Sequence, residues 1–402
     1  MFGELYSWYL RNPEYRSRVQ KLVQSAFAGK PKDIISQSVA KALYGEVSPY
    51  SATRLERFAA CAFAHFLQYG MKLTERVEYE FKPMDMGNVM HEALESFAEE
   101  VRKRGMKWTE LTEQERNEIA DRCLDNIVAD YGNTVLKSSA RNEYMIERTR
   151  RILRRTVWAL QKQLEQGEFQ PEGFEVTFGG GRIDRVDIME DQNKVYVKVI
   201  DYKTGNTSFD LVYLYHGLQL QLMIYLDGAL RVEQKKYPDK EIIPAGVFYY
   251  NIKDPMIQEK IDADVEAVSA GLMKELKMNG LVQADPELVY RMDSSLGSIP
   301  VAFNKDGSFR KNSSVADRTQ FAVLGRYVRT KIEKIRSSIL EGDAEVSPYE
   351  LGKKNACTYC PYMTVCGFDR RLSGYEFRRL KNFSDEELWK AFDREAEYCL
   401  LY

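Results

Sequence analysis

The sequence predicts an α/β fold, a mixed β-sheet flanked by helices, and three observations carry that prediction. The segments 174–178, 182–189 and 195–203 read as short strands, and the last alternates β-branched and larger residues with a period of two. The strongly apolar helix 216–230 follows them, and the buried strand 244–250 follows the helix. The order strand, strand, strand, helix, strand suits a sheet whose faces are covered by helices.

The bulk properties are those of an ordinary globular protein. At 402 residues the chain has the length of two or three domains. Its net charge of −2 does not by itself indicate a nucleic-acid binder, although phosphate binding depends on local patches. We find no apolar run that could span a membrane, no secretory signal peptide and no G-x-x-x-x-G-K-[ST] motif for ATP. We therefore expect a cytoplasmic protein without membrane contact.

The stretch 181–205 carries the chemistry. The alternation of the last predicted strand puts Asp201 and Lys203 on one face and Tyr202 on the other. A hairpin loop at 191–194 would pair Asp184 directly with Asp201, which brings two like charges together. A divalent metal with oxygen ligands would resolve that repulsion, and Lys203 would reach the same spot. Asp187 falls on the opposite face, where we expect it to pair with Arg185 or another cation.

Other candidate residues lie outside this stretch. Gln221 and Tyr225 are four residues apart on the apolar helix and share one face. The helix 141–162 is strongly basic, and it is either a solvated face or a surface that contacts phosphates. Glu175 is either a further carboxylate near the metal or a residue of the strand's surface.

The six cysteines include the motif C-x-x-C-x5-C, formed by Cys357, Cys360 and Cys366. Three thiols this close, outside a disulfide framework, indicate binding of zinc or of an iron–sulfur cluster. A fourth ligand has to come from elsewhere in the chain. The candidates are Cys61, Cys123 and Cys399.

The motifs G-x-I-D-x-x-D at 181–187 and D-Y-K-T-G at 201–205 resemble the RecB-like branch of the PD-(D/E)XK nuclease superfamily. G-x-x-x-H-x-x-L-E around His91 and Q-x-x-x-Y at 221–225 are similar to further motifs of that branch. The resemblance implies a restriction-endonuclease-like fold in which one or two Mg²⁺ ions are bound. It assigns the following residues to the active site: His91, Asp184, Asp201 and the Tyr202 carbonyl as metal ligands, Lys203 at the attacking water, and Gln221 and Tyr225 as positioning groups.

The cysteine arrangement narrows the resemblance to the AddB family of helicase–nuclease subunits. The segments LERFAACAFAHFLQYG around Cys61, PAGVFYYNIKDP, and CTYCPYMTVCGFD are similar to that family. It implies that Cys61, Cys357, Cys360 and Cys366 hold a [4Fe–4S] cluster that joins helical extensions at the two ends of the domain. Cys123 and Cys399 are then packing residues.

The same resemblance implies a domain organisation. Residues 1–50 would be a helical remnant of a preceding helicase-like region. Residues 51–402 would form the Fe–S nuclease domain, with its core at about 86–260 and its terminal cluster-binding segment at about 342–370.

The function implied is that of a Mg²⁺-dependent deoxyribonuclease, with exonuclease action on single-stranded DNA inside a helicase–nuclease complex for double-strand break repair and recombination. Its expected partners are DNA and an AddA-type subunit. One alternative is an Fe–S exonuclease of the CRISPR-associated RecB-like type. The other is a DNA-binding scaffold whose nuclease site has decayed.

Overall fold

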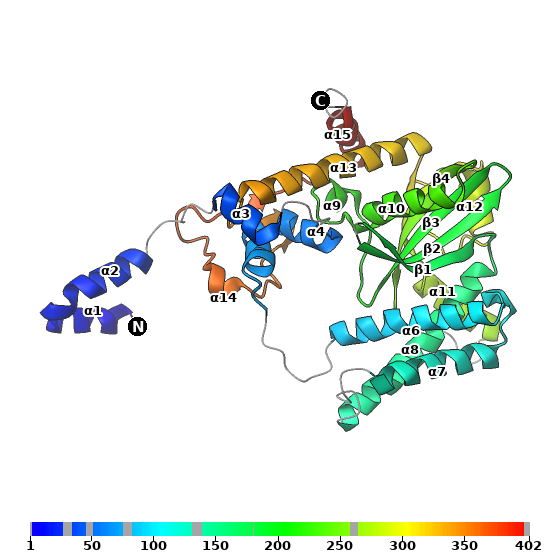
Figure 1. Ribbon diagram of the computed structural model, residues 1–402, viewed down its shortest axis with the longest axis horizontal. Helices are drawn as coiled ribbons and strands as arrows, with labels where there is room; N and C mark the ends of the chain where they lie inside the picture. Colours follow the sequence, from blue (N-terminus) through cyan, green and yellow to red (C-terminus); the bar gives the residue numbers. More distant parts are fainter. Residues whose placement is uncertain are drawn as a thin grey trace. The chain divides into compact units, whose positions relative to one another are not determined.

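The computed structural model describes residues 2–26, 34–45, 51–74, 83–130, 139–179, 181–257 and 264–397. The chain divides into two compact units (Figure 1). The first unit, called the cysteine unit below, comprises residues 1–48, 54–75 and 333–382. The second unit, called the sheet unit, comprises residues 49–53, 76–332 and 383–402.

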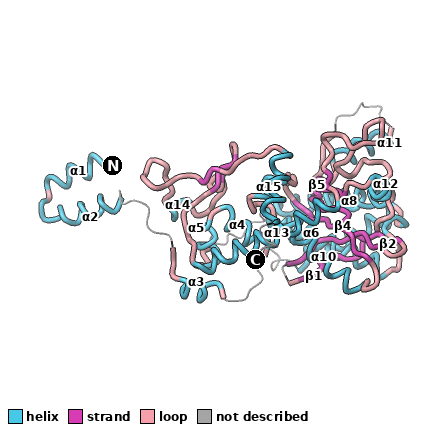
Figure 2. The backbone as a smooth tube through the Cα atoms, turned by 90° about the horizontal axis from the view of Figure 1, so that it is seen from above, coloured by secondary structure: helices cyan, strands magenta, loops and turns pink. Residues whose placement is uncertain are grey.

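The sheet unit is built on a six-stranded mixed sheet with the order β1-β2-β3-β4-β5-β6. Figure 2 shows strands of this sheet, among them β1, β2, β4 and β5, surrounded by helices. The first three strands are antiparallel, β4 runs parallel to β3, β5 is antiparallel to β4, and β6 is parallel to β5. The predicted mixed sheet is therefore confirmed. The strands are β1 (Gln170–Phe178), β2 (Gly181–Asp191), β3 (Lys194–Lys203), β4 (Glu241–Asn251), β5 (Asn279–Gln283) and β6 (Val315–Ala316).

The register of β2 against β3 fixes the position of the two acids. The ladder runs from Asp191 paired with Lys194 to Arg185 paired with Ile200. One more step of that ladder puts Asp184 opposite Asp201, as the hairpin prediction required. Asp201 is buried together with the preceding valines of β3, because the strand keeps its two-residue alternation up to its end.

Helices cover both faces of the sheet (Figure 1). On one face lie α6 (Pro83–Lys103), α7 (Glu113–Asp130) and α8 (Ala140–Leu164), whose apolar residues join those of the strands in a single core. On the other face lies α10 (Gln221–Lys236). Gly228 allows α10 to approach closely, because a Cβ atom there would lie 2.7 Å from the Phe178 ring of β1.

A buried ion group stabilises the centre of the hairpin on the face of α6. Arg185 donates two hydrogen bonds to Asp187, and the Lys198 ammonium lies 2.8 Å from the same carboxylate. The Arg185 guanidinium also lies over the rings of Trp108 and Phe174. The expected pairing of Asp187 with Arg185 is present, and both residues are fully buried. Removal of one member of such a group costs about 3–5 kcal/mol, because the remaining charge is left buried.

The cysteine unit joins early and late parts of the sequence. The N–H of Ile35 donates to Gly342, the N–H of Phe63 donates to Glu345, and the Tyr362 hydroxyl donates to the Leu73 carbonyl. The elements of this region are α1 (Phe2–Arg11), η1 (Pro13–Tyr15), α2 (Arg16–Ala26), α3 (Gln37–Tyr44), α4 (Ala52–Ala60), α5 (Ala62–His65), η2 (Phe66–Gly70), β7 (Tyr349–Leu351), β8 (Lys354–Asn355), α14 (Met363–Cys366) and β9 (Arg378–Arg379).

The remaining elements complete the chain between and after these segments. Within the described ranges, no helix has the length and the apolar run that a membrane crossing needs. The remaining elements are η3 (Trp108–Glu110), α9 (Leu211–Tyr215), α11 (Val265–Glu275), α12 (Pro286–Met292), α13 (Arg318–Glu341) and α15 (Asp385–Glu397).

Candidate active site and cysteine site

Three side chains that can bind a metal converge at the end of the sheet where β2 begins. They are His91 from α6, Glu175 from β1 and Asp184 from β2. The His91 Nδ1 atom lies 3.4 Å from an Asp184 oxygen and 3.7 Å from a Glu175 oxygen. One ligand atom from each residue lies within 4.8 Å of the other two. This spacing allows a single cation to contact all three.

The backbone of Tyr202 connects two of these ligands. Its N–H donates a hydrogen bond of 2.7 Å to the Asp184 carboxylate, and its carbonyl oxygen lies 3.1 Å from His91 Nε2. The Tyr202 ring lies on the face of the sheet opposite to the Asp201 side chain, where it packs edge-on against Tyr250. The peptide group of Tyr202 thus lies among the candidate ligands, while its side chain belongs to the core.

A polar chain extends from the second acid to α10. The Lys203 ammonium lies 2.6 Å from the Asp201 carboxylate and donates a hydrogen bond of 2.7 Å to the Gln221 side-chain oxygen. The Gln221 amide donates in turn to the Tyr225 hydroxyl over 2.9 Å. Gln221 therefore holds Lys203 directly, and Tyr225 holds Gln221. Together they fix the position of the Lys203 ammonium beside Asp201.

The pKa values of two residues show that the site favours positive charge beside its carboxylates. Burial and the neighbouring Asp184 raise the pKa of Asp201 to about 7, against the opposing effect of Lys203. Burial alone would lower the pKa of His91, but its contacts with Asp184 and Glu175 outweigh burial and raise that pKa to about 10. His91 and Lys203 lie within ion-pair distance of Asp184 and Asp201, so the carboxylates attract positive charge. A divalent cation can supply that charge.

The donor set fits a hard divalent ion. Carboxylate and carbonyl oxygens are the ligands that Mg²⁺ and Mn²⁺ prefer, and they outnumber the one imidazole nitrogen in this group. The structure brings all the predicted active-site residues to this end of the sheet. They are His91, Asp184, Asp201, Tyr202, Lys203, Gln221 and Tyr225.

Glu175 is the residue that the sequence left undecided. Its neighbours on β1 pair as Phe174 with Arg185 and Val176 with Ile183, which puts Glu175 opposite Asp184. The signal was present in the sequence, because a hairpin turn at Gly179–Gly181 implies this pairing. The same reasoning that placed Asp184 opposite Asp201 would have found it.

The four predicted cluster cysteines gather around one hollow in the cysteine unit. Cys61, Cys357, Cys360 and Cys366 line it together with apolar side chains that include Phe63 and Tyr362. The helical stretch that begins at Ala52 is interrupted at Cys61, whose backbone is extended (φ −166°, ψ 117°) between α4 and α5. The interruption takes the thiol out of the helical repeat and toward the other three.

The chemistry of this hollow fits a thiolate-bound metal group. Burial and the three neighbouring thiols raise the pKa of Cys357 to about 12, so four thiolates need a strong positive charge among them. Burial raises the pKa of the Cys61 thiol, and the backbone of Ala64, Ser347 and Phe63 opposes that rise. The N–H of Phe368 donates to the Cys366 sulfur over 3.4 Å. Hydrogen bonds to sulfur are a common feature of iron–sulfur sites. Cys123 is buried in the sheet unit, and Cys399 lies outside the described residues.

The basic helix 141–162 corresponds to α8, and most of its cations have partners within the chain. Arg150 pairs with Asp121, Asp125 and Glu147, and Arg154 pairs with Asp121. Arg151 pairs with Asp254, and Lys162 with Glu165. Part of the helix surface is thus neutralised within the chain, whereas Arg148 and Arg155 form no ion pair among the described residues.

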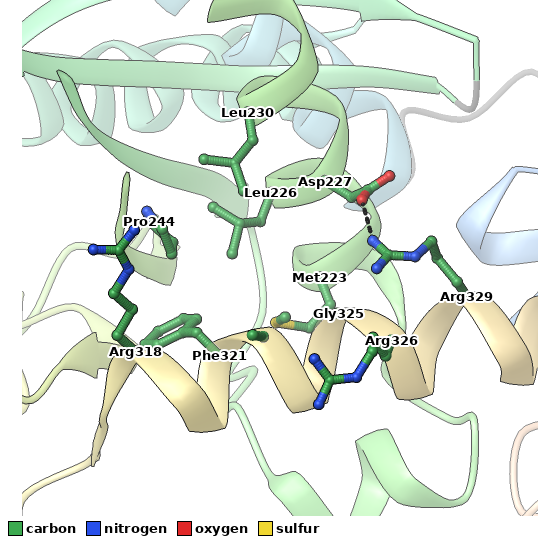
Figure 3. Close-up of a pocket in the computed structure, with 11 residues that line it drawn as sticks. Met223, Leu226, Asp227, Leu230, Pro244, Arg318, Phe321, Gly325, Arg326 and Arg329 are labelled. Carbon is green, nitrogen blue, oxygen red and sulfur yellow. Dashed lines mark hydrogen bonds and ion pairs between the residues drawn. The ribbon is translucent and has the colours of Figure 1, made fainter. Parts of the chain in front are cut away.

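A second hollow lies between α10 and α13, and its lining includes Met223, Leu226 and Asp227 of α10 (Figure 3). It has a volume of about 320 Å³. Its floor is apolar, with Leu226, Leu230 and Phe321, and the Arg329–Asp227 ion pair lies at its rim. It has no contact with the candidate ligands of the active site.

The fold and the first site together define a nuclease class in which a central mixed sheet presents acids and a lysine at the end of adjacent strands. A family model described as the PD-(D/E)XK nuclease superfamily matches residues 49–367, and the chain belongs to this superfamily.

Its curated relatives carry a more particular name. The chain is 41% identical to the B-type ATP-dependent helicase/deoxyribonuclease subunit of Lachnoclostridium phytofermentans, over 99% of this chain and 36% of that protein. It is 34% identical to the proteins of the same name from Alkaliphilus metalliredigens and Clostridium acetobutylicum, over 99% and 98% of this chain. It covers 37% and 36% of those two proteins. The chain thus spans a little over a third of the length of these relatives.

Proposed function

We propose that this chain is a Mg²⁺-dependent deoxyribonuclease that hydrolyses phosphodiester bonds. The observation that carries the proposal is the convergence of His91, Asp184 and Asp201 with Lys203 at one end of the sheet. A decayed site would have lost at least one of these groups. The family membership supports the same reaction class, since it places the chain among nucleases.

Each residue has a defined task in this proposal. Mg²⁺ bound by His91, Asp184, Asp201 and the Tyr202 carbonyl supplies Lewis acidity that activates water and neutralises charge on the scissile phosphate. Lys203 orients the attacking water or helps to deprotonate it, and it stabilises the negative charge that develops on the phosphate. Gln221 holds the Lys203 ammonium through its side-chain oxygen, and Tyr225 holds Gln221.

We also propose that Cys61, Cys357, Cys360 and Cys366 hold a [4Fe–4S] cluster. The hollow that the four thiols line and the Phe368 N–H that donates to the Cys366 sulfur support this assignment. The role is structural, because Cys61 and Cys357 are about three hundred positions apart and a fixed link closes that long loop.

The wider setting follows from the relatives' name. We propose that the chain works on single-stranded DNA as an exonuclease inside a helicase–nuclease complex with an AddA-type subunit, in the repair of double-strand breaks. The relatives are named as helicase/deoxyribonuclease subunits, which supports such a complex.

The nuclease proposal is tested with the purified protein and a labelled DNA of mixed single- and double-stranded character. We expect cleavage that requires Mg²⁺, stops with EDTA and is lost in Lys203→Gln. A Lys203→Gln protein that cleaves like the wild type would refute the active-site assignment. A protein that binds the DNA without cutting it would favour the scaffold alternative.

The cluster proposal is tested by absorption and metal analysis of protein purified without oxygen. We expect a broad band near roughly 400 nm and about four irons per chain, both lost in Cys360→Ser and kept in Cys123→Ser. Stoichiometric zinc in place of iron would overturn the cluster and leave the nuclease proposal intact.

A further inference from the structure

Glu175 stands apart from the other acids of the site because its carboxylate is shared between the site and a surface cation. One of its oxygens lies 3.7 Å from His91 Nδ1, and the other lies 2.5 Å from the Arg182 guanidinium. The Glu175 side chain is only 8% exposed, whereas that of Arg182 is 63% exposed. A buried acid is thus held by a cation that is itself largely in water.

The backbone at Glu175 is unusual for a residue inside a strand. Its φ is +48°, in the left-handed region that glutamate seldom adopts, while its neighbours on β1 continue the ladder with β2. A conformation of this kind is retained only where the surrounding structure fixes it, and such conformations concentrate at functional sites. Here the result is that the Glu175 carboxylate points at His91 and Asp184.

We propose that Glu175 is a further metal ligand of this nuclease, and that Arg182 is the cation which holds it until the metal and the DNA arrive. The inference rests on the proposed metal site and extends it by two residues. When a divalent cation occupies the group of His91, Glu175 and Asp184, the positive charge of Arg182 beside Glu175 is no longer needed.

The position of Arg182 suits a second task after its release. It lies two residues before Asp184 on β2, so the two side chains leave the strand on the same face. Its exposed guanidinium can turn from Glu175 to a phosphate oxygen, since arginine binds carboxylate and phosphate with the same geometry. Metal loading and DNA contact would thereby be linked through one residue.

The test compares Mn²⁺ binding, measured by calorimetry in the absence of DNA, in the full chain and in Glu175→Gln. We expect roughly a 10-fold loss of Mn²⁺ affinity or more, the usual effect of losing a group that supports a metal site. Glu95→Gln is the matched control. Glu95 lies on α6 close enough to Glu175 and Arg182 to feel both charges, but it is not in the ligand group. It should change the affinity by less than about 2-fold.

The role of Arg182 is tested by a double-mutant cycle. Arg182→Ala should tighten Mn²⁺ binding several-fold in the wild-type background and have no effect in the Glu175→Gln background, because it acts through Glu175. Equal tightening in both backgrounds would show that Arg182 acts only as a general charge and would overturn its assigned role.

Two results separate this inference from the metal site on which it rests. If wild-type protein does not bind Mn²⁺, the metal site is wrong and the inference fails with it. If wild-type protein binds Mn²⁺ but Glu175→Gln and Glu95→Gln shift the affinity equally, only the inference is overturned. Should Glu175→Gln not fold, Glu175→Gly replaces it, because glycine adopts a positive φ without strain. That variant should keep the melting temperature and lose the Mn²⁺ affinity.

Discussion

The two candidate sites of this protein are built in opposite ways. The acidic site takes most of its groups from three neighbouring strands and the helix that follows them, between Glu175 and Tyr225. The cysteine site takes one thiol from near the start of the chain and three from near its end. The first is held by a hydrogen-bonded ladder, and the second by short elements that a few long-range contacts bring together.

This difference predicts which site depends on its metal group. A ladder that also carries the buried Arg185–Asp187–Lys198 group has its geometry fixed before any ion arrives. In the cysteine unit, the described part of the apolar cluster around Cys61 contains Ala64, Leu67 and Tyr362, with Phe63, Phe66 and Ala356 packed against them. We therefore expect the acidic site to lose function but not structure when its metal is removed, and the cysteine site to lose both.

The largest expected effect is the loss of cleavage in Asp184→Asn. The substitution keeps an oxygen that can accept the Tyr202 N–H but removes a charged ligand. We expect cleavage to fall on the order of 10³-fold or more, because metal catalysis supplies several kcal/mol and each 1.36 kcal/mol is tenfold in rate. The free energy of unfolding should change by less than about 1 kcal/mol. Cleavage and chemical unfolding are measured on the same preparation.

Asp227→Asn is the control for that experiment. Asp227 lies on α10 at the rim of the second hollow, where it pairs with Arg231 and Arg329. Its loss should leave cleavage within about 2-fold of wild type. An Asp184→Asn protein that keeps Mg²⁺-dependent cleavage would contradict the assignment of the site to this end of the sheet.

The next effect is regional and concerns Cys360→Ser. We expect amide hydrogen exchange in the cysteine unit to speed up by at least about 100-fold, since a group held at 100 times its Kd contributes about 2.7 kcal/mol. Exchange in β2 and β3 should stay unchanged. Cys123→Ser replaces a buried thiol of the sheet unit and should not change the rate of amide hydrogen exchange in the cysteine unit. Equal exchange in Cys360→Ser and wild type would remove the contrast between the two sites.

The third effect is a pH dependence confined to the cysteine unit. Burial, with Arg54 and Arg57 nearby, lowers the pKa of His65 from its ordinary 6.5 to about 3. The unfolded chain then binds one more proton than the folded chain between these values, so stability is complete above about pH 6.5 and falls below it.

We expect the cysteine unit to lose on the order of 1.3 kcal/mol between pH 7 and pH 5.5, as 1.36 kcal/mol corresponds to one pH unit. The change is followed by hydrogen exchange at the two pH values. His65→Gln should remove most of the slope, because His65 is the sole histidine of the three in the sequence that belongs to this unit. A slope that survives the substitution would assign the pH dependence to other groups.

The sequence predicted the mixed sheet and the placing of Asp184 against Asp201, because both depend on local patterns. The two-residue alternation and a symmetric hairpin were enough to place Asp201 and Lys203 on one face and to set Asp184 against Asp201. The role of His91 and the choice of Cys61 as the fourth thiol came from a resemblance, since no local rule brings Cys61 to Cys357. That convergence depends on tertiary contacts such as the one from Phe63 to Glu345.

Two features of the structure could not be predicted from the sequence. The positive φ of Glu175 is a property of the assembled strand pair, and glutamate carries no sequence signal for it. The partners of the α8 arginines come from α7 and from Asp254, which lies about a hundred residues away. A run of basic residues has the same sequence pattern whether its side chains bind phosphates or pair with carboxylates. Its function therefore depends on which residues pack beside it.

The smallest expected effect tests this last point with Arg151→Ala. Arg151 is 65% exposed and pairs with Asp254, so the substitution should cost less than about 1 kcal/mol of stability. If α8 does not contact DNA, the dependence of DNA affinity on salt should be unchanged, measured by titration at several salt concentrations. A slope that falls by about 0.9 would show that Arg151 gives up its carboxylate for a phosphate. In that case DNA that leaves the acidic site would bind along α8.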